Sequence, residues 1–490
     1  MFRFSLLCAL ALSLSLNLSS AFKWMGKIKL PQLQDMKAQR DAQKRFGDKK
    51  VVVITGTSSG LGRAATKALL GTGEYHVIGA VRDLDKMEII AEMEGFDSSN
   101  FTPMECDLQS FSSVRNFVEG LKEYLSGRKL DRLVCNAAVY QPTLDYAKWT
   151  PDGFEQQLQT NYLSHFLMIS LLLDTMRGAQ DPRCIMIGSV TGNDNTVGGG
   201  GVWPRADLKN LEGLRLGGKR PLSMIDGYNF NGAKAYKDTK LALMMLANTL
   251  HSKYNKATGI SFSSMYPGCI AASPLFREKR PWFRKYFPVF MKYITGGFVG
   301  EDEAGQRLMQ AVHDPKCSKS GVYWGWNGGA RVGRGMESLE KDGQIIGAGG
   351  AGGGWDSVFE NEQSDKVLDI EKAVELFKLS TQVTGAEWPD PKGYKSPCPT
   401  LRLVDLMTAV VEQKEEMERM KNPPRPVGEE AEREEQTEDK EEETAAPEPV
   451  SPRREQPVPS EPVRRRKPSF SPPPLNLPFP LPPVRVPAFG

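Results

Sequence analysis

A tyrosine and a lysine four residues apart are the clearest candidates for chemistry in this sequence. Tyr236 and Lys240 stand in the segment Tyr-Lys-Asp-Thr-Lys, inside a stretch whose residues favour a helix. Residues four apart on a helix share one face, so Lys240 is expected beside Tyr236. A nearby ammonium favours the phenolate, which predicts that the pKa of Tyr236 falls from about 10 towards neutrality, where the phenol exchanges protons.

A glycine-rich turn is the candidate for binding a cofactor. A continuous apolar strand at residues 51–54 leads directly into the turn Thr-Gly-Thr-Ser-Ser-Gly-Leu-Gly at residues 55–62, which opens a helix. Glycines let the backbone approach a pyrophosphate, whose charge then lies at the helix N-terminus. The strand before and the helix after are the context that a dinucleotide site requires, although glycine-rich turns also occur in other α/β proteins. The expected contacts are Gly56, Ser58, Ser59, Gly60, Leu61 and Gly62.

The residue that ends the second expected strand selects between the two nicotinamide cofactors. An acid there binds the ribose hydroxyls of NAD, whereas a cation accommodates the 2′-phosphate of NADP. Arg82 lies twenty residues beyond Gly62 and precedes Asp83. The sequence therefore favours NADPH, with Arg63 as a candidate second contact. An ordinary surface arginine is the alternative interpretation of Arg82.

Three further motifs follow in chain order. An Asn-Ala-Ala turn at residues 136–138 comes after the fourth expected strand, a Thr-Asn-Tyr segment at 160–162 follows, and Gly-Ser-Val-Thr-Gly at 188–192 comes after the fifth strand. With the glycine-rich turn and the Tyr–Lys pair, this order resembles the short-chain dehydrogenase/reductase family. The resemblance implies that Ser189 hydrogen-bonds near the reacting centre and that Lys240 also binds the nicotinamide ribose. It implies a catalytic set of Asn161, Ser189, Tyr236 and Lys240, and cofactor contacts at Asn136, Ala137, Ala138, Tyr236 and Lys240.

Longer stretches narrow the resemblance. Residues 133–143, 188–193, 224–227, 230–238, 266–271, 275–278 and 320–324 closely resemble the light-dependent protochlorophyllide oxidoreductases, and the likeness spans roughly residues 49–385. Tyr-Pro-Gly-Cys-Ile-Ala at 266–271 is the most specific stretch, because it is not a general feature of the larger family. The segment Thr-Asn-Tyr-Leu-Ser-His-Phe at 160–166 departs from the usual Thr-Asn-His-Leu-Gly-His-Phe.

This closer resemblance implies a substrate and a reaction. NADPH would deliver a hydride to a ring D carbon of protochlorophyllide after the pigment absorbs light, and Tyr236 would supply the proton. Cys269 is implied as a pigment contact with a candidate proton role, although without the resemblance it is an ordinary small buried residue. Tyr140 and Tyr228 either line the pigment cavity or pack in the core. Further implied cofactor contacts are Asp107, Leu108, Pro267 and Gly268.

A parallel sheet with crossover helices must position these residues. From residue 51 onward, short β-rich runs alternate with amphipathic helical stretches. The expected strands are 51–54, 75–81, 101–105, 132–135, 184–187, 261–266 and 321–324. The fold class is therefore predicted as α/β: a single Rossmann-type doubly wound parallel sheet of about seven strands with helices on both faces. The catalytic domain is expected at residues 48–388, with a Gly-rich insertion at 328–354.

Composition excludes several classes of protein. A net charge of +3 over 490 residues lacks the concentrated basic excess of a nucleic-acid binder. Seven cysteines without C-x-x-C spacing and four histidines without metal-pair spacing predict reduced thiols and no metal site.

The two ends of the chain differ from the catalytic domain. Residues 1–21 have the pattern of a signal peptide, and residues 22–47 are basic like a transit peptide. Together they predict delivery through the ER to a plastid, with simple secretion as the alternative. Residues 389–490 carry acidic, basic and proline-rich blocks and are predicted to be mostly disordered, with either a protein partner for the proline-rich end or no constraint at all.

One aromatic and basic segment and two other functions stay open at this stage. Three roles are open for residues 282–298: covering the pigment, touching a plastid membrane surface, or packing in the core. A homo-oligomer is a separate hypothesis. A dark reductase of a hydrophobic, retinoid-like carbonyl fits the Tyr–Lys pair equally well, but Cys269 and its neighbours favour the pigment. The other alternative is an inactive scaffold that binds the pigment. The complete set of four catalytic residues argues against it, because a binding protein need not retain them.

Overall fold

The computed structural model describes residues 30–293, 298–326, 339–341, 344–346 and 358–394. The predicted signal peptide, most of the Gly-rich insertion and the tail beyond residue 394 lie outside the described residues. None of the helices within the described ranges is both long enough and apolar enough to cross a membrane.

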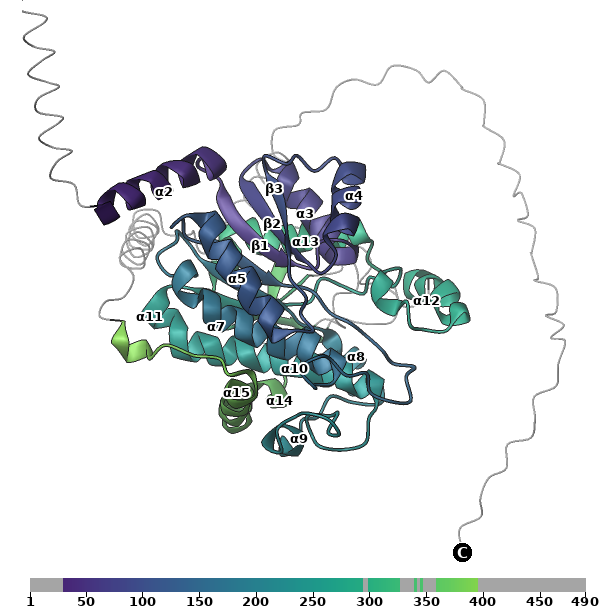
Figure 1. The fold of residues 1–490 in the computed structure, drawn as a ribbon. Helices are drawn as coiled ribbons and strands as arrows, with labels where there is room; N and C mark the ends of the chain where they lie inside the picture. Colours follow the sequence, from purple (N-terminus) through teal and green to yellow (C-terminus); the bar gives the residue numbers. More distant parts are fainter. Residues whose placement is uncertain (1–29, 294–297, 327–338, 342–343, 347–357, 395–490) are drawn as a thin grey trace, which may run out of the picture. The chain divides into compact units, whose positions relative to one another are not determined.

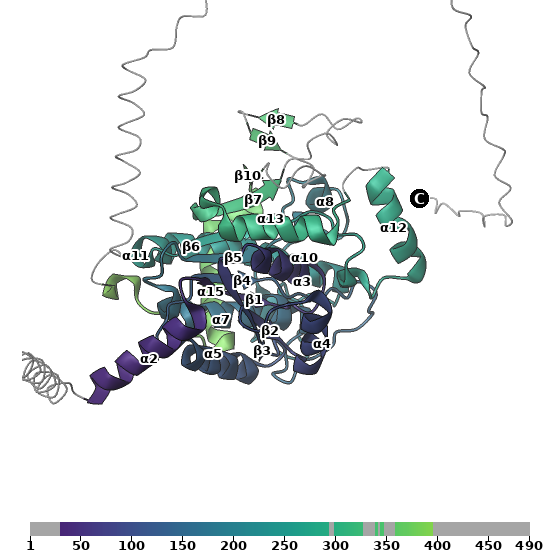
Figure 2. The same cartoon turned by 90° about the horizontal axis from the view of Figure 1, so that it is seen from above.

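The centre of the domain is an eight-stranded sheet in the order β10-β7-β6-β5-β4-β1-β2-β3 (Figures 1 and 2). Strands β1 to β7 pair in parallel, and β10 pairs antiparallel with β7. The seven expected strands are confirmed, whereas the edge strand β10 was not expected. The strands are β1 Lys50–Thr55, β2 Tyr75–Val81, β3 Phe101–Glu105, β4 Arg132–Cys135, β5 Arg183–Ile187, β6 Ser261–Met265, β7 Val322–Trp326 and β10 Val358–Asn361, and a separate hairpin joins β8 Leu339–Lys341 to β9 Gln344–Ile346.

Helices α3 Gly60–Gly71, α4 Leu84–Glu94 and α13 Glu301–His313 cover one face of the sheet. Alternate residues of β1, Val52 and Ile54, face this layer and are fully buried, as expected for a strand covered on both sides. Helix α13 packs closely on α3, because a Cβ on Gly305 would lie 2.6 Å from the backbone carbon of Ala64.

Two buried arginines bind the C-terminus of α13, at the end of this helical layer. Arg132 Nε donates to the carbonyl of Val312 at 2.9 Å, and Arg183 Nη1 donates to that of Asp314 at 2.7 Å. The Asp181 carboxylate balances both guanidinium groups, at 3.0 and 2.6 Å. These cations satisfy carbonyls that a helix end leaves without intrahelical partners.

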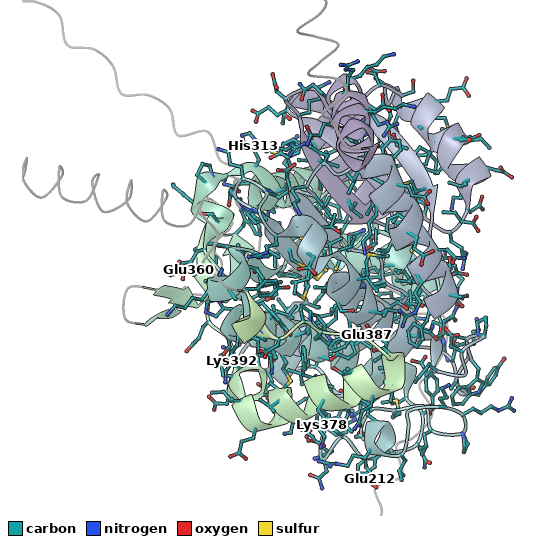
Figure 3. All side chains as sticks on the ribbon, turned by 60° about the vertical axis from the view of Figure 1, so that its left-hand side comes forward. Glu212, His313, Glu360, Lys378, Glu387 and Lys392 are labelled. Carbon is teal, nitrogen blue, oxygen red and sulfur yellow. The ribbon has the colours of Figure 1, made fainter. Side chains whose placement is uncertain are left out.

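Helices α5 Phe111–Leu125, α7 Ser164–Met176, α10 Gly232–Leu250 and α15 Ile370–Thr384 cover the opposite face. Val51 and Val53 of β1 face this second layer. The outer side of α15 meets solvent: Lys378 points away from the domain in Figure 3, and its side chain is 63% exposed. The sheet is therefore buried between two helical layers, which confirms the doubly wound architecture.

The end of the transit-like segment is helical and reaches this second layer. Helix α2 spans Leu30–Phe46, and Ala42 and Phe46 are buried. The ring of Phe46 lies edge-on to His76 with a centroid separation of 5.0 Å. Residues just beyond the expected end of the domain also pack on it, since the Tyr394 hydroxyl donates to Asp174 at 2.8 Å. The domain boundaries at 47 and 388 stay predictions.

Short elements complete the loops. They are α6 Gln156–Leu158, the π-helical turns η1 Gln159–Leu163 and η3 His251–Asn255, α8 Val197–Gly200, α9 Glu212–Arg215, α11 Lys256–Thr258, α12 Pro281–Tyr293, α14 Asp365–Leu368, and the 3-10 turns η2 Val190–Gly192, η4 Pro274–Phe276, η5 Pro315–Ser318 and η7 Pro391–Gly393. Helix α12 lies at the periphery of the domain in Figures 1 and 2 and contains no buried residue.

Candidate active site

The loop between β1 and α3 forms a cradle that has no room for a side chain at Gly62. A Cβ on Gly62 would lie only 2.2 Å from the Gly56 carbonyl oxygen and 2.6 Å from Asn136 Nδ2, so no larger residue fits there. Ser59 precedes α3 with extended backbone, and its side chain makes no capping hydrogen bond. The first N–H groups of α3 are thus left to an anion, which fits the pyrophosphate of a dinucleotide.

Asn136 ties this cradle to the Asn-Ala-Ala turn after β4. Its Nδ2 donates to the carbonyl of Thr55 at 2.8 Å. The backbone N–H groups of Asn136 and Ala137 both donate to Thr55 Oγ1, at 2.9 Å each. The Thr55 hydroxyl therefore holds two loops of the cofactor site in register.

His165 continues this network into the catalytic region. Its Nε2 lies 2.9 Å from Thr55 Oγ1, and its Nδ1 lies 3.0 Å from the carbonyl of Asn161. Because the Thr55 oxygen already accepts two N–H groups, its own proton points to Nε2, and Nδ1 of His165 carries the ring proton. Burial lowers the pKa of His165 to about 4, so the ring is neutral. Neither Thr55 nor His165 was among the predicted site residues.

The ribose end of the cofactor site contains Arg82 and Asp83 after β2. Asp83 caps α4, because its Oδ1 accepts the N–H of Lys86 at 3.0 Å. Arg82 is exposed. Arg63, the candidate second contact, is 3.0 Å from Glu301 and 3.5 Å from Glu94. One oxygen of the Asp83 carboxylate is thus engaged in a helix cap, and both Arg82 and Asp83 are exposed.

Helix α10 carries the Tyr–Lys pair from its first turns. Asn231 caps it by accepting the N–H of Lys234 at 3.0 Å. Ser189 lies close enough to the Tyr236 hydroxyl for its side chain to lower the pKa of that phenol. Lys240 Nζ lies 5.6 Å from the centroid of the Tyr236 ring and donates to the carbonyl of Ile187 at 2.7 Å. The structure thus brings Ser189, Tyr236 and Lys240 together, as the sequence predicts.

Close backbone approach holds Ser189 in this position. A Cβ on Gly192 would lie 2.7 Å from the backbone nitrogen of Leu241, so the turn η2 rests directly on α10. Ser189 precedes this turn and its Oγ accepts the N–H of Thr191 at 3.2 Å. The glycine three residues after Ser189 is therefore required by the packing of this turn on α10.

The expected fall in the pKa of Tyr236 is wrong for this structure. Burial raises the pKa of the Tyr236 phenol well above its ordinary value, the charges of Tyr140 and Cys269 add to the rise, and the Ser189 hydrogen bond opposes it. Burial also lowers the pKa of Lys240 to about 7. Because water is excluded from both groups, the desolvation of each charged form outweighs their attraction.

Asn161 lies in the π-helical turn η1 and is fully buried. Its Oδ1 accepts the N–H of Val139 at 2.8 Å, and its Nδ2 donates to the carbonyl of the same residue at 3.0 Å. Nδ2 also lies 3.2 Å from Thr239 Oγ1 on α10. The side chain of Asn161 therefore fixes the loop after β4 against the catalytic helix.

The implied pigment residues divide into two groups. The Tyr140 ring lies 4.6 Å from that of Tyr236, and Cys269 is close enough to raise the pKa of Tyr236. Burial raises the pKa of Cys269 to about 12, so the thiol keeps its proton at neutral pH. Tyr228, in contrast, is 63% exposed, and its assignment stays a prediction.

The remaining implied cofactor contacts follow β3 and β6. Asp107 Oδ1 accepts the N–H of Gln109 at 2.9 Å, and the Leu108 side chain is buried in the core. Pro267 offers its carbonyl to the buried Arg307 at 3.0 Å. Gly268 has a φ of +113°, and a Cβ there would lie 2.4 Å from Val299. These residues lie at the carboxyl ends of strands, where ligands of such sheets bind.

Fold and site together define a short-chain dehydrogenase. A family model described as "short chain dehydrogenase" matches residues 50–201. A short-chain dehydrogenase/reductase of Brucella melitensis has 15% sequence identity and a TM-score of 0.41, and the match covers 57% of this chain and 95% of that one.

Closer relatives identify the group within this class. The chloroplastic protochlorophyllide reductase of Chlamydomonas reinhardtii is 46% identical over 339 residues, covering 69% of this chain and 78% of the relative. The chloroplastic protochlorophyllide reductase of Cucumis sativus is 46% identical over 353 residues, covering 71% of this chain and 81% of the relative. The chain belongs to the protochlorophyllide reductase family, as the motifs at 266–271 and 230–238 had indicated.

Proposed function

We propose that this chain is a light-dependent NADPH:protochlorophyllide oxidoreductase that reduces the ring D double bond of the pigment to give chlorophyllide. One observation carries the proposal within the family. Tyr236 lies near Ser189, Tyr140 and Cys269, so the proposed proton donor is next to two residues implied for the pigment.

The proposal gives each side chain a separate task. NADPH supplies the hydride when it is bound. Tyr236 remains protonated at neutral pH because burial raises its pKa, so its O–H is available for the second ring D carbon. Ser189 orients that hydroxyl, and Lys240, whose pKa is lowered to about 7, can restore the proton to the phenolate. Thr55, Asn136 and Asn161 hold the surrounding loops in place.

NADPH is the proposed cofactor rather than NADH. The glycine cradle fits a pyrophosphate, and Asp83 is engaged in capping α4. The exposed Arg82 beside it matches the charge of a 2′-phosphate.

A plastid location and a peripheral membrane contact are the remaining parts of the proposal. The relatives above are named chloroplastic, and we propose that residues 1–47 direct this chain to a plastid through the ER. Helix α12 exposes apolar side chains beside basic ones, which is the composition of a helix that lies on an anionic membrane surface. The exposed apolar residues are Trp282, Tyr286, Val289, Phe290 and Tyr293.

Illumination of the purified full-length chain tests the reaction. With NADPH and protochlorophyllide, chlorophyllide absorbance is expected to appear only after light, and not in a matched dark sample. Dark turnover of a hydrophobic carbonyl would instead favour an ordinary short-chain reductase. Bound pigment that light leaves unconverted would indicate an inactive binding protein.

A further inference from the structure

Two lysines beside the catalytic residues have no acidic partner. Lys237, the residue after Tyr236, is only 4% exposed, and its Nζ donates to the carbonyl of Val202 at 2.8 Å. Lys279 Nζ lies 5.4 Å from the centroid of the Tyr140 ring and 5.1 Å from that of Phe283. Within the described residues, neither lysine forms an ion pair, and no carboxylate raises the pKa of either one.

Lys234, on the same helix as Lys237, shows what acidic partners do to a lysine here. Lys234, one turn earlier, is bonded to Asp226 at 2.7 Å and to Asp238 at 2.6 Å. The pKa of Lys234 is accordingly raised, whereas burial lowers the pKa of both Lys237 and Lys279. The positive charge of Lys279 contributes to the fall at Lys237, so the two ammonium groups repel each other. An anion between the two ammonium groups would offset both the burial of their charges and their mutual repulsion.

The position of the pair indicates which anion this is. The Tyr140 ring is 4.6 Å from the Tyr236 ring, and Lys279 Nζ is 5.4 Å from the centroid of the Tyr140 ring. Lys279 is thus one aromatic ring away from the proposed proton donor, and Lys237 is the residue next to that donor on α10. The proposed substrate carries a propionate on ring D itself, so its carboxylate hangs on a short chain from the ring that is reduced.

We propose that Lys237 and Lys279 form a subsite for the ring D carboxylate of protochlorophyllide, which places the ring D double bond against Tyr236. This inference rests on the proposed function. The ammonium groups form charge-assisted hydrogen bonds to the carboxylate, while the apolar macrocycle lies along Tyr140. The subsite selects the free acid over its esters and fixes which of the four rings is presented to the proton donor.

A cofactor phosphate is the other source of an anion in this region. The segment that carries Lys279 begins near the cradle, since Ser273 Oγ would lie 3.3 Å from a Cβ on Gly60. The pigment is favoured because Lys237 follows Tyr236 on α10 and Lys279 lies over Tyr140, which contacts Tyr236. An experiment must nevertheless measure both ligands.

The test is a binding titration of the full-length chain in the dark. The dissociation constants of protochlorophyllide and of its methyl ester are measured with saturating NADPH from the absorbance change, and that of NADPH is measured separately. The variants are Lys237→Met, Lys279→Met and the double substitution. Lys285→Met on the exposed face of α12 removes the same charge from a nearby residue and is the matched control. Lys237→Arg and Lys279→Arg test rescue by charge.

Each methionine substitution is expected to weaken binding of the free acid about tenfold while leaving the ester and NADPH within about twofold. The Lys285→Met control should bind all three ligands like the wild type, and the arginine variants should recover most of the loss. Equal weakening of acid and ester would refute the carboxylate subsite. Weaker NADPH binding alone would assign the lysines to the cofactor.

The outcome is separable from that of the proposed function. If the wild type binds acid and ester equally and photoconverts both, the function stands and the subsite is wrong. If the wild type binds neither pigment, the function and the subsite both fail. Because Lys237 also holds the Val202 loop, thermal unfolding of Lys237→Met is compared with the wild type, and Lys279→Met provides the independent measurement.

Discussion

Replacing His165 by phenylalanine should break the link between the cofactor loop and the catalytic turn. His165 Nδ1–H donates to the Asn161 carbonyl at 3.0 Å, and Nε2 accepts the Thr55 hydroxyl proton at 2.9 Å. Phenylalanine fills the space but leaves the buried Asn161 carbonyl without that donor. The Thr55 hydroxyl can turn only to the Val134 carbonyl, which is 3.4 Å away.

The magnitude follows from the groups left unsatisfied. An unpaired buried acceptor costs about 1–3 kcal/mol, so His165→Phe should lower the free energy of unfolding by about that amount at pH 7.5. Thr55→Val should cost more, because two backbone N–H groups lose their shared acceptor. If the two side chains act through their mutual hydrogen bond, the double variant should be about 1 kcal/mol less damaging than the sum of the single ones.

The pH dependence has a definite sign. In the folded chain the pKa of His165 is lowered to about 4, from an ordinary value of 6.5. Below pH 6.5 the unfolded chain therefore binds a proton that the folded chain refuses, so the stability contributed by the neutral ring is full above pH 6.5 and is lost as the pH falls towards 4. Between pH 7.5 and 5.0 this amounts to about 2 kcal/mol. The wild type should lose that much more stability than His165→Phe over the interval.

Urea unfolding at pH 7.5 and 5.0 measures both effects. His165→Asn keeps a donor near the Asn161 carbonyl and Thr55→Ser keeps the hydroxyl, so both should be milder than their apolar counterparts. His76, whose pKa is also lowered to about 4 by burial, is present in every variant and cancels from the comparison. Strictly additive losses, or the same pH slope with and without His165, would refute the assigned network.

Three further substitutions test other parts of the structure. Tyr236→Phe should retain pigment binding but slow chlorophyllide formation after a flash by about 10²–10⁴-fold, and an unchanged rate would remove Tyr236 as the proton donor. Arg82→Asp should shift the ratio of kcat/KM for NADPH over NADH towards NADH by at least about tenfold, whereas an unchanged ratio would place the 2′-phosphate elsewhere. Arg183→Met should lower the free energy of unfolding in urea by about 3 kcal/mol, because the carbonyls of Ala311 and Asp314 lose a buried donor and Asp181 loses an ion-pair partner. A loss below about 1 kcal/mol would show that other groups satisfy that helix end.

The sequence was most informative where one short segment determines a feature. The run Val51–Ile54 is apolar at every position, and it is a strand buried on both faces. The glycines of the cofactor turn are diagnostic because the backbone of the turn leaves no space for a Cβ at Gly62. The i, i+4 spacing placed Lys240 beside Tyr236 correctly.

Features that depend on distant segments could not be predicted in the same way. The edge strand β10 is a four-residue element after a Gly-rich stretch, and among the described strands it pairs only with β7. The bond between Thr55 and His165 joins residues 110 positions apart. A histidine four residues after Asn161 was visible in the sequence, but its partner across the sheet was not. Likewise, the lack of an acid near Lys237 and Lys279 emerges only when α10 and the segment before α12 are brought together.

The pKa of Tyr236 shows most clearly why position does not determine chemistry. The spacing gives the neighbour of Tyr236 but not the solvent exposure of the pair, and burial destabilises phenolate and ammonium alike. Lys240 donates a hydrogen bond to the Ile187 carbonyl. Burial, and not the charge of Lys240, has the largest effect on the pKa of Tyr236. A phenol that holds its proton at neutral pH is a poor base towards a resting substrate. Its raised pKa instead suits the role proposed for Tyr236, that of the acid that protonates a strongly basic ring D carbon.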